Sequence, residues 1–513
     1  MRIDATGSER TGRALWRARV AATPGRTFLR YERRMWTYAE FDDVVMRTAG
    51  GLVELGVERG TRVLLGLTNR PEAIALQFAL QQLGAVSVPL VPGGTFDELA
   101  YLVNHCRAPL LVADDPIASL VEPRTHELRY LEQIVAPDAV PAAAPIDPPA
   151  LEAYDDRSLA YVLYTSGSTA RPKGVMIPAG SFWSCGDLFA ERYELTEDDN
   201  YFLPLPLGHA IGALSAMSMT LHRGSSVTLV DRFSPASFWE VTREHGATIS
   251  ILFPAQLNLL LETDDGTPAC GESTFRLLST HVYIDGFRDR FGIELALTWG
   301  MTETGAICTI TEPGYRGELG EGYVGTCPRG VEVACFSAAG DRLPPGESGE
   351  ICMRHPHVML GYLDDPVATA ASLRDGWVRS GDRGVVRPDG HVFFHGRIKN
   401  VIKRSGENIS AEEVEGALER LGDILECVVF AVPDPIRTEE VAAVVRGKPG
   451  AAVAPVRLRA VLGEALARWK LPRYVDVRSE PLPRLANGKL DRRAVEAAFD
   501  PETAWDVERN NRS

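Results

Sequence analysis

Residues 164–175 read YTSGSTARPKGV, and they follow the apolar run LAYVL at residues 159–163. The apolar run is typical of a buried strand, so we expect the hydroxyl-rich stretch to form a loop at the end of that strand. Small residues let backbone amides approach an anion closely, hydroxyl groups donate to its oxygens, and Arg171 and Lys173 add positive charge. The stretch therefore predicts a phosphate-binding loop, although the same composition also suits an ordinary solvated loop. It is not the common nucleotide P-loop, because Lys173 is followed by glycine rather than by Ser or Thr.

Length and charge narrow the classes of function. The chain has 513 residues and a formal net charge of -15. Several subdomains are expected at this length, and the acidic balance argues against nucleic acid and against an anionic membrane surface as partners. The cysteines are scattered without a Cys-x-x-Cys pair, which favours free thiols in a reducing compartment. With a polar N-terminus and no apolar stretch of about 20 residues, the sequence predicts a cytoplasmic protein.

Helix and strand patterns alternate before the phosphate loop. Thr37 and Glu40 form a capping-box pattern at the start of an amphipathic helix. Residues 63–65 and 85–90 are typical of strands, and residues 71–83 between them are typical of a helix. Such alternation predicts parallel sheets covered by helices.

Two acidic residues follow later strand patterns. Residues 297–304 read LTWGMTET, a strand that leads into a glycine-bearing turn with Glu303. A carboxylate near bound phosphates is the ligand that Mg²⁺ prefers, although Glu303 would equally suit a solvated loop. Residues 375–382 read DGWVRSGD, in which Asp382 either caps a turn or accepts two hydrogen bonds from a ribose diol.

From Gly396 onwards the composition changes. Residues 396–408 are basic and rich in glycine, and a second capping-box pattern begins at Ser410. Strand patterns at residues 427–432 and 441–445 and a helix pattern at residues 456–469 complete a small α+β module, large enough to fold around its own core.

A tight turn and a polar tail end the chain. Asn487 and Gly488 predict a tight turn that projects Lys489. An exposed lysine is most often only solubilising. Residues 502–513 are polar and are expected to fray.

Taken together, these segments resemble the adenylate-forming enzymes, which include acyl-CoA synthetases, luciferases and the adenylation domains of peptide synthetases. The resemblance extends from about Thr37 to about Arg493. It rests on motifs that occur in the order of the family, at residues 165–174, 299–303, 380–382, 396–406 and 487–489.

The resemblance implies an α/β fold with a large N-terminal domain and a small mobile C-terminal domain. Residues 1–396 would form a large N-terminal AMP-binding domain of several subdomains, with sheets covered by helices, that carries the acyl pocket and the ATP grip. Residues 397–400 would be a hinge, residues 401–500 a small mobile α+β lid domain, and residues 501–513 a polar tail. The reaction implied is attack of a carboxylate on ATP to give an acyl-adenylate and pyrophosphate, followed by displacement of AMP by a thiol.

The resemblance also implies roles for individual residues. ATP and AMP would be bound by Thr165, Ser166, Gly167, Ser168, Thr169, Lys173, Trp299, Gly300, Thr302, Asp382 and Arg397. The catalytic residues would be Lys489, Thr302 and Glu303, with Glu303 also the magnesium ligand. Lys489 would bridge the substrate carboxylate and the α-phosphate. Lys399 would be the hinge about which the small domain swings, and Gly406 and His209 would line the channel for the thiol.

The sequence departs from the family pattern at several places. Ala170 stands where a glycine is usual, and Asn400 replaces the usual acid after the hinge. The segment between Leu277 and Phe291 is shorter than in the family and lacks its Gly-Gly-Ala-Pro-like turn, which implies a specialised adenine wall and acyl pocket.

Three functions remain open from the sequence. The first is a carboxylate–CoA ligase that requires ATP, magnesium and coenzyme A, and whose small acid substrate is hydrophobic or aromatic, as the apolar residues 213–219 and 253–261 suggest. The second is a stand-alone ligase that loads the acid onto the phosphopantetheine arm of an acyl carrier protein in secondary metabolism. Basic residues that would meet either the 3′-phosphate of CoA or an acidic carrier are Arg404, Lys470 and Arg473. The third is a non-catalytic nucleotide-binding scaffold.

Overall fold

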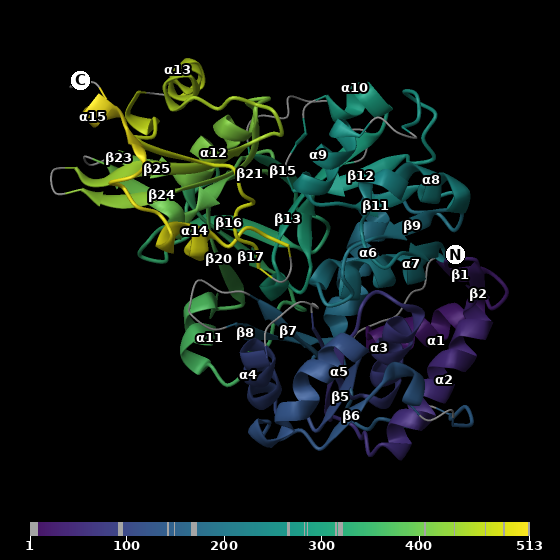
Figure 1. Ribbon diagram of the computed structural model, residues 1–513. Coiled ribbons are helices and arrows are strands. Elements are labelled where there is room, and N and C mark those ends of the chain that lie inside the picture. Colours follow the sequence, from purple (N-terminus) through teal and green to yellow (C-terminus); the bar gives the residue numbers. More distant parts are fainter. Residues whose placement is uncertain are drawn as a thin grey trace. The chain divides into compact units, whose positions relative to one another are not determined.

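Figure 1 shows a computed structural model of the chain, which describes residues 9–90, 96–140, 143–147, 149–165, 172–263, 267–281, 283–284, 286–312, 315, 322–404, 407–434, 437–466, 468–485 and 488–510. The chain divides into two compact units. The first comprises Met1–Val333, Cys352–Arg379 and Pro388–Val392, and the second comprises Ala334–Ile351, Ser380–Arg387 and Phe393–Ser513. Among the residues described, no helix has both the length and the apolar character needed to span a membrane.

The first unit contains a sheet that carries the predicted phosphate loop. Its strands, in spatial order, are β18 (Gly361–Tyr362), β8 (Lys173–Pro178), β7 (Leu159–Thr165), β4 (Val86–Pro89), β3 (Arg62–Gly66), β5 (Leu110–Ala113) and β6 (Gln133–Val135). The strands from β7 to β6 pair in parallel, whereas β8 pairs antiparallel with both of its neighbours. The loop between β7 and β8 therefore lies at the carboxyl end of the parallel strands.

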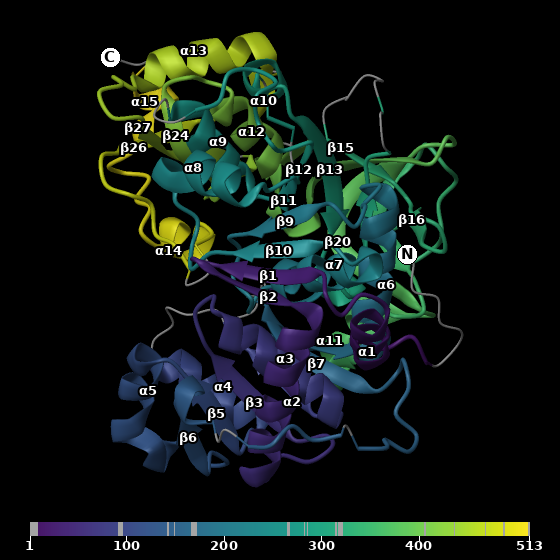
Figure 2. The same ribbon diagram turned by 90° about the vertical axis from the view of Figure 1, so that its right-hand side faces the viewer.

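A second sheet of this unit carries the predicted TWGMTE motif. The strands of this sheet that lie wholly in the first unit and follow one another in space are β15 (Tyr323–Thr326), β14 (Cys308–Ile310), β13 (Glu294–Gly300), β12 (Leu277–Thr280), β11 (Ile249–Ile251), β9 (Asn200–Leu203), β10 (Ser226–Leu229), β1 (Thr27–Tyr31) and β2 (Arg34–Thr37). Figure 2 shows the run from β12 to β2 side by side. Pairing is parallel from β13 to β1, so the carboxyl ends of these strands meet at one edge.

Helices cover both sheets, as the alternating sequence pattern predicts. On one sheet, α4 (Phe96–Cys106) and α5 (Asp115–Val121) pack against strand residues such as Leu64, Val88 and Val162. On the other, α8 (Pro235–His245), α9 (Pro254–Glu262) and α10 (Phe287–Phe291) form a core with Phe202, Leu278 and other strand residues. Helix α6 (Ala179–Arg192) contacts strands of both sheets and therefore lies between them.

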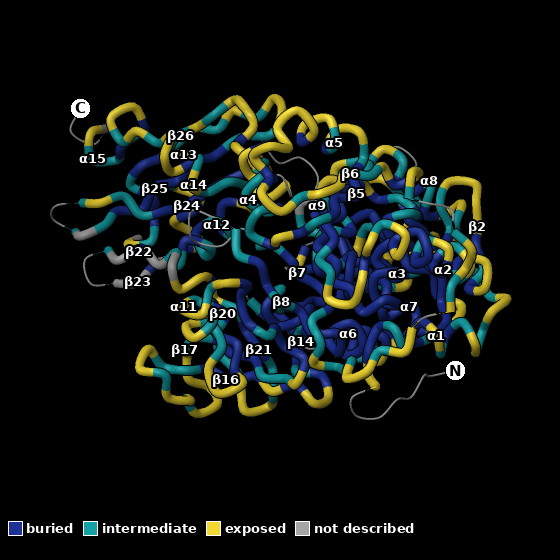
Figure 3. Tube along the Cα trace, turned by 90° about the horizontal axis from the view of Figure 1, so that it is seen from below, coloured by how far each residue is buried: buried dark blue, intermediate teal, exposed yellow. Residues whose placement is uncertain are grey.

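The remaining helices of the first unit confirm several local predictions. They are α1 (Gly12–Ala22), α2 (Tyr38–Glu54), α3 (Pro71–Leu83), α7 (Met217–Arg223) and α11 (Pro366–Ser372). The Thr37–Glu40 capping box begins α2, and α3 has the predicted bounds. Nearly every residue of α3 is buried, and Figure 3 shows it in dark blue together with α7. A helix that is buried on all sides is mostly apolar all round, and the buried Gln77 and Gln81 of α3 donate hydrogen bonds to the Leu207 carbonyl and the Tyr161 hydroxyl oxygen.

The second unit is an α+β module. Its strands are β22 (Val401–Arg404), β23 (Glu407–Ser410), β24 (Ile424–Asp434), β25 (Thr438–Gly447), β26 (Tyr474–Arg478) and β27 (Trp505–Asp506), and its helices are α12 (Ala411–Glu419), α13 (Pro455–Ala465), α14 (Arg492–Ala497) and α15 (Val507–Asn510). Alternate residues of β24 and β25 point to opposite faces, so that α12 and α13 cover one core and α14 covers the other. Four strands have residues in both units: β16 (Glu332–Phe336), β17 (Ser348–Arg354), β20 (Trp377–Val386) and β21 (His391–Arg397). The short strand β19 (Leu373–Arg374) pairs with β20.

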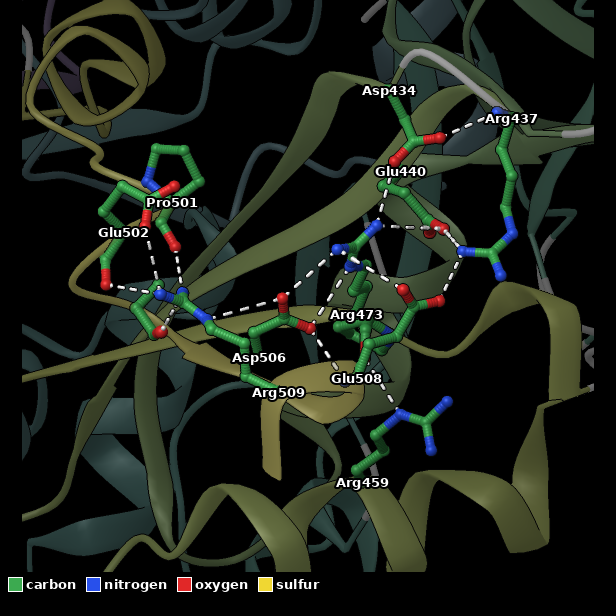
Figure 4. A network of polar contacts seen from close by, with 12 residues as sticks. Asp434, Arg437, Glu440, Arg459, Arg473, Pro501, Glu502, Asp506, Glu508 and Arg509 are labelled. Carbon is green, nitrogen blue, oxygen red and sulfur yellow. Dashed lines mark hydrogen bonds and ion pairs between the residues drawn. The ribbon is translucent and has the colours of Figure 1, made fainter. Parts of the chain in front are cut away.

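The predicted fold class, α/β with sheets covered by helices and a smaller α+β domain, is confirmed. The expected fraying of residues 502–513 is not what the structure shows up to residue 510. Trp505 and Asp506 pair with β26, and α15 follows. The reason is electrostatic: the Asp506 carboxylate accepts two hydrogen bonds from Arg473, both of 3.2 Å (Figure 4). Residues 511–513 lie outside the described part of the chain.

Candidate active site

The phosphate-loop motif lies where two antiparallel strands join. Thr165 ends β7, Lys173 begins β8, and the two residues are paired in register. The predicted strand before the loop is therefore confirmed. Four of the proposed phosphate-binding residues, Ser166, Gly167, Ser168 and Thr169, lie outside the described residues, as does Arg171.

Lys173 and Glu303 both contact Tyr362. The Lys173 ammonium lies 4.9 Å from the centroid of the Tyr362 ring, a cation–π distance. The Tyr362 hydroxyl donates a hydrogen bond of 2.8 Å to Glu303 Oε1. Both Tyr362 and Glu303 are 7% exposed. The structure thus brings two of the predicted site residues together through a third residue that the sequence motifs did not reveal.

The turn that carries Glu303 is fixed by its own residues. Strand β13 ends with Trp299 and Gly300, and a short 3-10 helix, Thr302–Thr304, follows. The Met301 amide donates to the Thr304 hydroxyl oxygen at 3.2 Å. Gly300 has to be glycine, because a Cβ there would lie 2.5 Å from the sulfur of Cys308. Thr302 and Glu303 are therefore presented at the carboxyl end of β13.

Residues 357–363, which we call the bridging segment, join this turn to the phosphate-loop strand. The Met359 amide donates to the Glu303 carbonyl at 2.9 Å, and the Leu363 amide donates to the Gly174 carbonyl at 2.8 Å. Between them, β18 pairs with β8 at Tyr362 and Val175. The bridging segment thus connects the turn after β13 of one sheet with strand β8 of the other.

A buried histidine anchors the start of the bridging segment. His357 Nδ1 lies 2.6 Å from the hydroxyl of Ser184 on α6, and His357 Nε2 lies 2.8 Å from Asp156 Oδ2. The Ser181 hydroxyl donates to the His357 carbonyl at 2.6 Å. Burial lowers the pKa of His357, and the Asp156 carboxylate opposes that shift. Because His357 and Ser184 are both buried, this set holds the segment in place rather than exposing a nucleophile.

Three rings lie along the carboxyl edge of the second sheet. His209 follows β9, Phe253 follows β11 and His281 follows β12, and these strands are neighbours. Ring centroids are 5.6 Å apart for His209 and Phe253 and 5.9 Å apart for Phe253 and His281. His281 Nδ1 lies 3.3 Å from the carbonyl of Thr298 on β13. In sheets of this kind, ligands bind at the carboxyl ends of the strands. The ring row therefore lies at the edge where an acid pocket is expected.

The segment between Leu277 and Phe291, which is shorter than in the adenylate-forming enzymes, contains His281, the last ring of the row. Strand β12 ends at Thr280, and the next helix, α10, begins at Phe287. Phe287 and Phe291 are fully buried and close the core beneath this edge. Val282 and Asp285 lie outside the described residues.

In the second unit, the predicted ribose-binding pair is in contact. Arg397 Nε lies 2.8 Å from Asp382 Oδ1, and another nitrogen of the Arg397 guanidinium donates to the Ser380 carbonyl at 3.1 Å. Asp382 is 3% exposed, and its amide donates a hydrogen bond of 2.9 Å to the Ser380 hydroxyl oxygen. Gly381 has φ of +71°, a conformation that favours glycine, and this turn aims the Asp382 carboxylate at Arg397.

Lys489 lies near the same arginine. The Gly488 amide donates to the Leu485 carbonyl, and the Leu485 amide donates to the Lys489 carbonyl, each at 2.8 Å. Burial and the Arg397 charge lower the pKa of Lys489. The Lys489 side chain is exposed to solvent, and the charge of Arg397 acts on it from nearby. Two cations close together form a favourable place for an anion.

The other predicted residues of the second unit are placed in part. Lys399 lies in a 3-10 turn, Ile398–Asn400, but its side chain is outside the described residues, as is all of Gly406. The cations suggested for the 3′-phosphate of CoA are each paired inside the unit: Arg404 with Glu440, Lys470 with Glu413, and Arg473 with Asp434 and Asp506. Their charge is therefore already offset before any ligand binds.

Known proteins share this architecture along most of the chain. The family described as AMP-binding enzyme matches residues 16–363, and the AMP-binding enzyme C-terminal domain matches residues 413–489. Crotonobetaine/carnitine–CoA ligase of Salmonella typhi is 29% identical over 489 residues, which cover 89% of this chain and 92% of that protein.

Solved structures agree with these matches. The o-succinylbenzoate CoA synthetase of Bacillus subtilis, in complex with its acyl-adenylate intermediate, is 27% identical with a TM-score of 0.85, and the match covers 95% of this chain and 98% of that one. The same enzyme was solved with ATP and a magnesium ion. An anthranilate CoA ligase in complex with anthranoyl-AMP is 22% identical with a TM-score of 0.87, covering 95% and 97% of the two chains, and shares the fold.

Proposed function

The chain belongs to the AMP-binding enzymes of the adenylate-forming superfamily and is an AMP-forming acid–thiol ligase, and from this premise we propose that it joins a hydrophobic or aromatic carboxylic acid to coenzyme A. The observation that carries the proposal is the contact of Tyr362 with both Lys173 and Glu303. Because a cation and a carboxylate contact the same tyrosine, this observation supports a site for phosphates and a metal ion.

The central chemical difficulty is that two anions must meet. A carboxylate oxygen attacks the α-phosphorus of ATP, so the enzyme has to position both anions and neutralise their charge. We assign Lys173, with Thr165, Ser166, Gly167, Ser168 and Thr169, to the β- and γ-phosphates, and Thr302 to the α-phosphate. Trp299 and Gly300, at the end of β13, would hold the nucleotide beside that turn.

The residues present suit a magnesium ion. Glu303 offers a carboxylate, the hard oxygen ligand that Mg²⁺ prefers, and the Tyr362 bond engages one of its two oxygens. Bound there, Mg²⁺ would neutralise charge on the phosphates. Lys173 would share that task from its position over the Tyr362 ring.

We assign the remaining roles to residues of the second unit. We assign Asp382 and Arg397 to the ribose hydroxyls of the same nucleotide and Lys489 to the substrate carboxylate and the α-phosphate. The lowered pKa of Lys489 beside Arg397 supports this, since an anion that binds there relieves the repulsion between the two cations. Lys399 would be the hinge for the change between adenylation and thioester formation, and Gly406 would line the thiol channel together with His209.

The acid would lie against the ring row. Phe253, flanked by His209 and His281, gives a flat apolar surface with polar edges, which suits an aromatic or hydrophobic acid. Free coenzyme A is favoured as the acceptor, because the relatives named above that match over most of the chain are CoA ligases. Transfer to a carrier protein is the second candidate.

The test is exchange of labelled pyrophosphate into ATP, measured over a library of carboxylic acids. We expect exchange with at least one acid, and loss of that exchange in Lys489→Ala with ATP binding retained, because this lysine acts chiefly in the transition state. Exchange with no acid would refute the enzyme assignment for the chain. Thioester formation is then followed with free CoA and with a panel of carriers, and turnover with carriers alone would replace the first candidate by the second.

A further inference from the structure

We propose that Tyr362 is a positioning residue for adenylation, which holds the Glu303 carboxylate for the metal and the Lys173 ammonium for the phosphates at the same time. The inference rests on the proposed function, since it concerns the same site. It adds a residue that touches neither substrate nor metal and acts through two residues that do.

Tyr362 fixes the orientation of the Glu303 carboxylate. The hydroxyl of Tyr362 donates to Oε1 of Glu303 at 2.8 Å, so this oxygen is fixed and the carboxylate plane cannot rotate freely. A hydrogen bond to a charged group is stronger than a neutral one, and both residues are buried. Glu303 is also held through its backbone carbonyl by the Met359 amide. The carboxylate is therefore preorganised before a metal arrives.

Tyr362 contacts two side chains of opposite charge, Lys173 and Glu303. An ammonium and a carboxylate that are close together would attract each other and form an ion pair, and both would then be less available to ligands. The Tyr362 ring offers Lys173 a neutral surface whose quadrupole still favours a cation, at 4.9 Å. The hydroxyl of the same residue satisfies Glu303. Tyr362 thus stabilises both charges without bringing them together.

Tyr362 is itself held in place by the backbone around it. It lies on β18, which pairs with β8 at Val175, two positions from Lys173. Leu360 and Leu363, on either side, donate to backbone carbonyls of residues 176 and 174, each at 2.8 Å. His357 anchors the start of the bridging segment between Ser184 and Asp156. A side chain that orients others needs this kind of support to be effective.

A buried tyrosine with a satisfied hydroxyl is by itself ordinary, so the test has to separate positioning from folding. Tyr362→Phe removes the hydroxyl and keeps the ring. Tyr38→Phe is the matched control. Tyr38, on α2, is also buried, and its hydroxyl donates to the Ser225 carbonyl at 2.7 Å. Isothermal titration calorimetry measures ATP affinity with excess Mg²⁺ and with EDTA for each variant, and thermal unfolding is followed in parallel.

We expect the gain in ATP affinity that Mg²⁺ gives to fall by about 10- to 100-fold in Tyr362→Phe, the usual effect of removing a group that orients a metal ligand. ATP affinity in EDTA should stay at the wild-type value, and so should both affinities in Tyr38→Phe. In Tyr362→Leu, which also loses the ring, ATP affinity in EDTA should fall as well, because Lys173 loses its support. Pyrophosphate exchange should show a lower kcat in Tyr362→Phe with an unchanged KM for the acid.

Two results would overturn the inference. One is an undiminished Mg²⁺ effect in Tyr362→Phe, and the other is an equal loss in Tyr362→Phe and Tyr38→Phe, which would indicate a general effect on folding. Failure of the wild-type protein to bind ATP at all is a different result, because it removes the proposed function and the inference with it.

Discussion

Glu440 is expected to control the stability of the second unit. Its side chain is fully buried, with 0% exposure, and three arginines surround it. Figure 4 shows two of them, Arg437 and Arg473. Arg404 Nε lies 2.6 Å from Glu440 Oε2, Arg437 pairs with Oε1, and Arg473 lies 3.9 Å from Oε1. Arg404 ends β22, whereas Arg437 and Arg473 immediately precede β25 and β26, so that one carboxylate links three strands.

The size of the effect follows from burial. Glu440→Gln keeps the shape of the side chain but leaves three guanidinium groups without their shared anion. Removing one partner of a buried ion pair costs about 3–5 kcal/mol. Arg437 is 34% exposed at its side chain, and Arg473 keeps Asp434 and Asp506 as partners. We therefore expect the lower end, about 3 kcal/mol of the free energy of unfolding.

The assay is urea unfolding followed by tryptophan fluorescence, since Trp469 and Trp505 lie in this unit. We expect the midpoint to fall while the slope with denaturant is unchanged. Glu502→Gln is the matched control, because Glu502 also pairs with an arginine, Arg509 at 3.3 Å, but is 86% exposed at its side chain. Exposed pairs contribute little, so the control should unfold like the wild-type protein. Equal behaviour of the two variants, or a more stable Glu440→Gln, would refute the reasoning.

Two further outcomes are expected, one for stability and one for specificity. Burial raises the pKa of Glu415 to about 7 from its ordinary value of 4.5, against the effect of Arg492, so between these values the folded state binds more protons than the unfolded state. The free energy of unfolding should therefore fall as the pH rises towards 7 and level off above that value. The measurement is the urea midpoint between pH 5 and 8, and its fall with pH should disappear in Glu415→Gln. A fall with pH that persists in this variant would contradict the role of Glu415. Phe253→Ala should lower kcat/KM for aromatic acids by about 10-fold or more in pyrophosphate exchange, with the KM for ATP unchanged, because a large ring surface is lost from the acid pocket. An unchanged acid profile would place the acid elsewhere.

Local sequence signals predicted what local interactions decide. The capping box of Thr37 and Glu40 and the bounds of α3 were predictable because their hydrogen bonds span only a few residues. The strand before the phosphate loop was predictable because an unbroken apolar run is typical of a buried parallel strand. Asp382 and Arg397 came from motifs of the family, and the structure places them in contact.

Contacts between distant parts of the chain were not predictable in this way. Tyr362 and Glu303 are 59 positions apart in the sequence. The Gly-Tyr pair at residues 361–362 forms no motif that would mark Tyr362 as a site residue. Asp506 accepts hydrogen bonds from Arg473, which lies 33 positions earlier, and the polar segment that contains Asp506 pairs with β26 as a strand. Both misses have the same cause, because the deciding partner is far away in sequence and close in space.

The two groups of site residues handle charge in opposite ways, and this difference fits the ligands proposed for them. Asp382 is paired directly with Arg397, so their combined charge is small, which suits the neutral hydroxyls of a ribose. Lys173 and Glu303 instead share a neutral tyrosine, so each keeps its charge for a ligand of the opposite sign. A highly charged triphosphate and a divalent cation gain most from groups that have not already paired with each other, because pairing would have to be broken at a cost before they bind. The contact of Tyr362 with both groups therefore supports the proposal that this part of the first unit binds a metal–nucleotide complex.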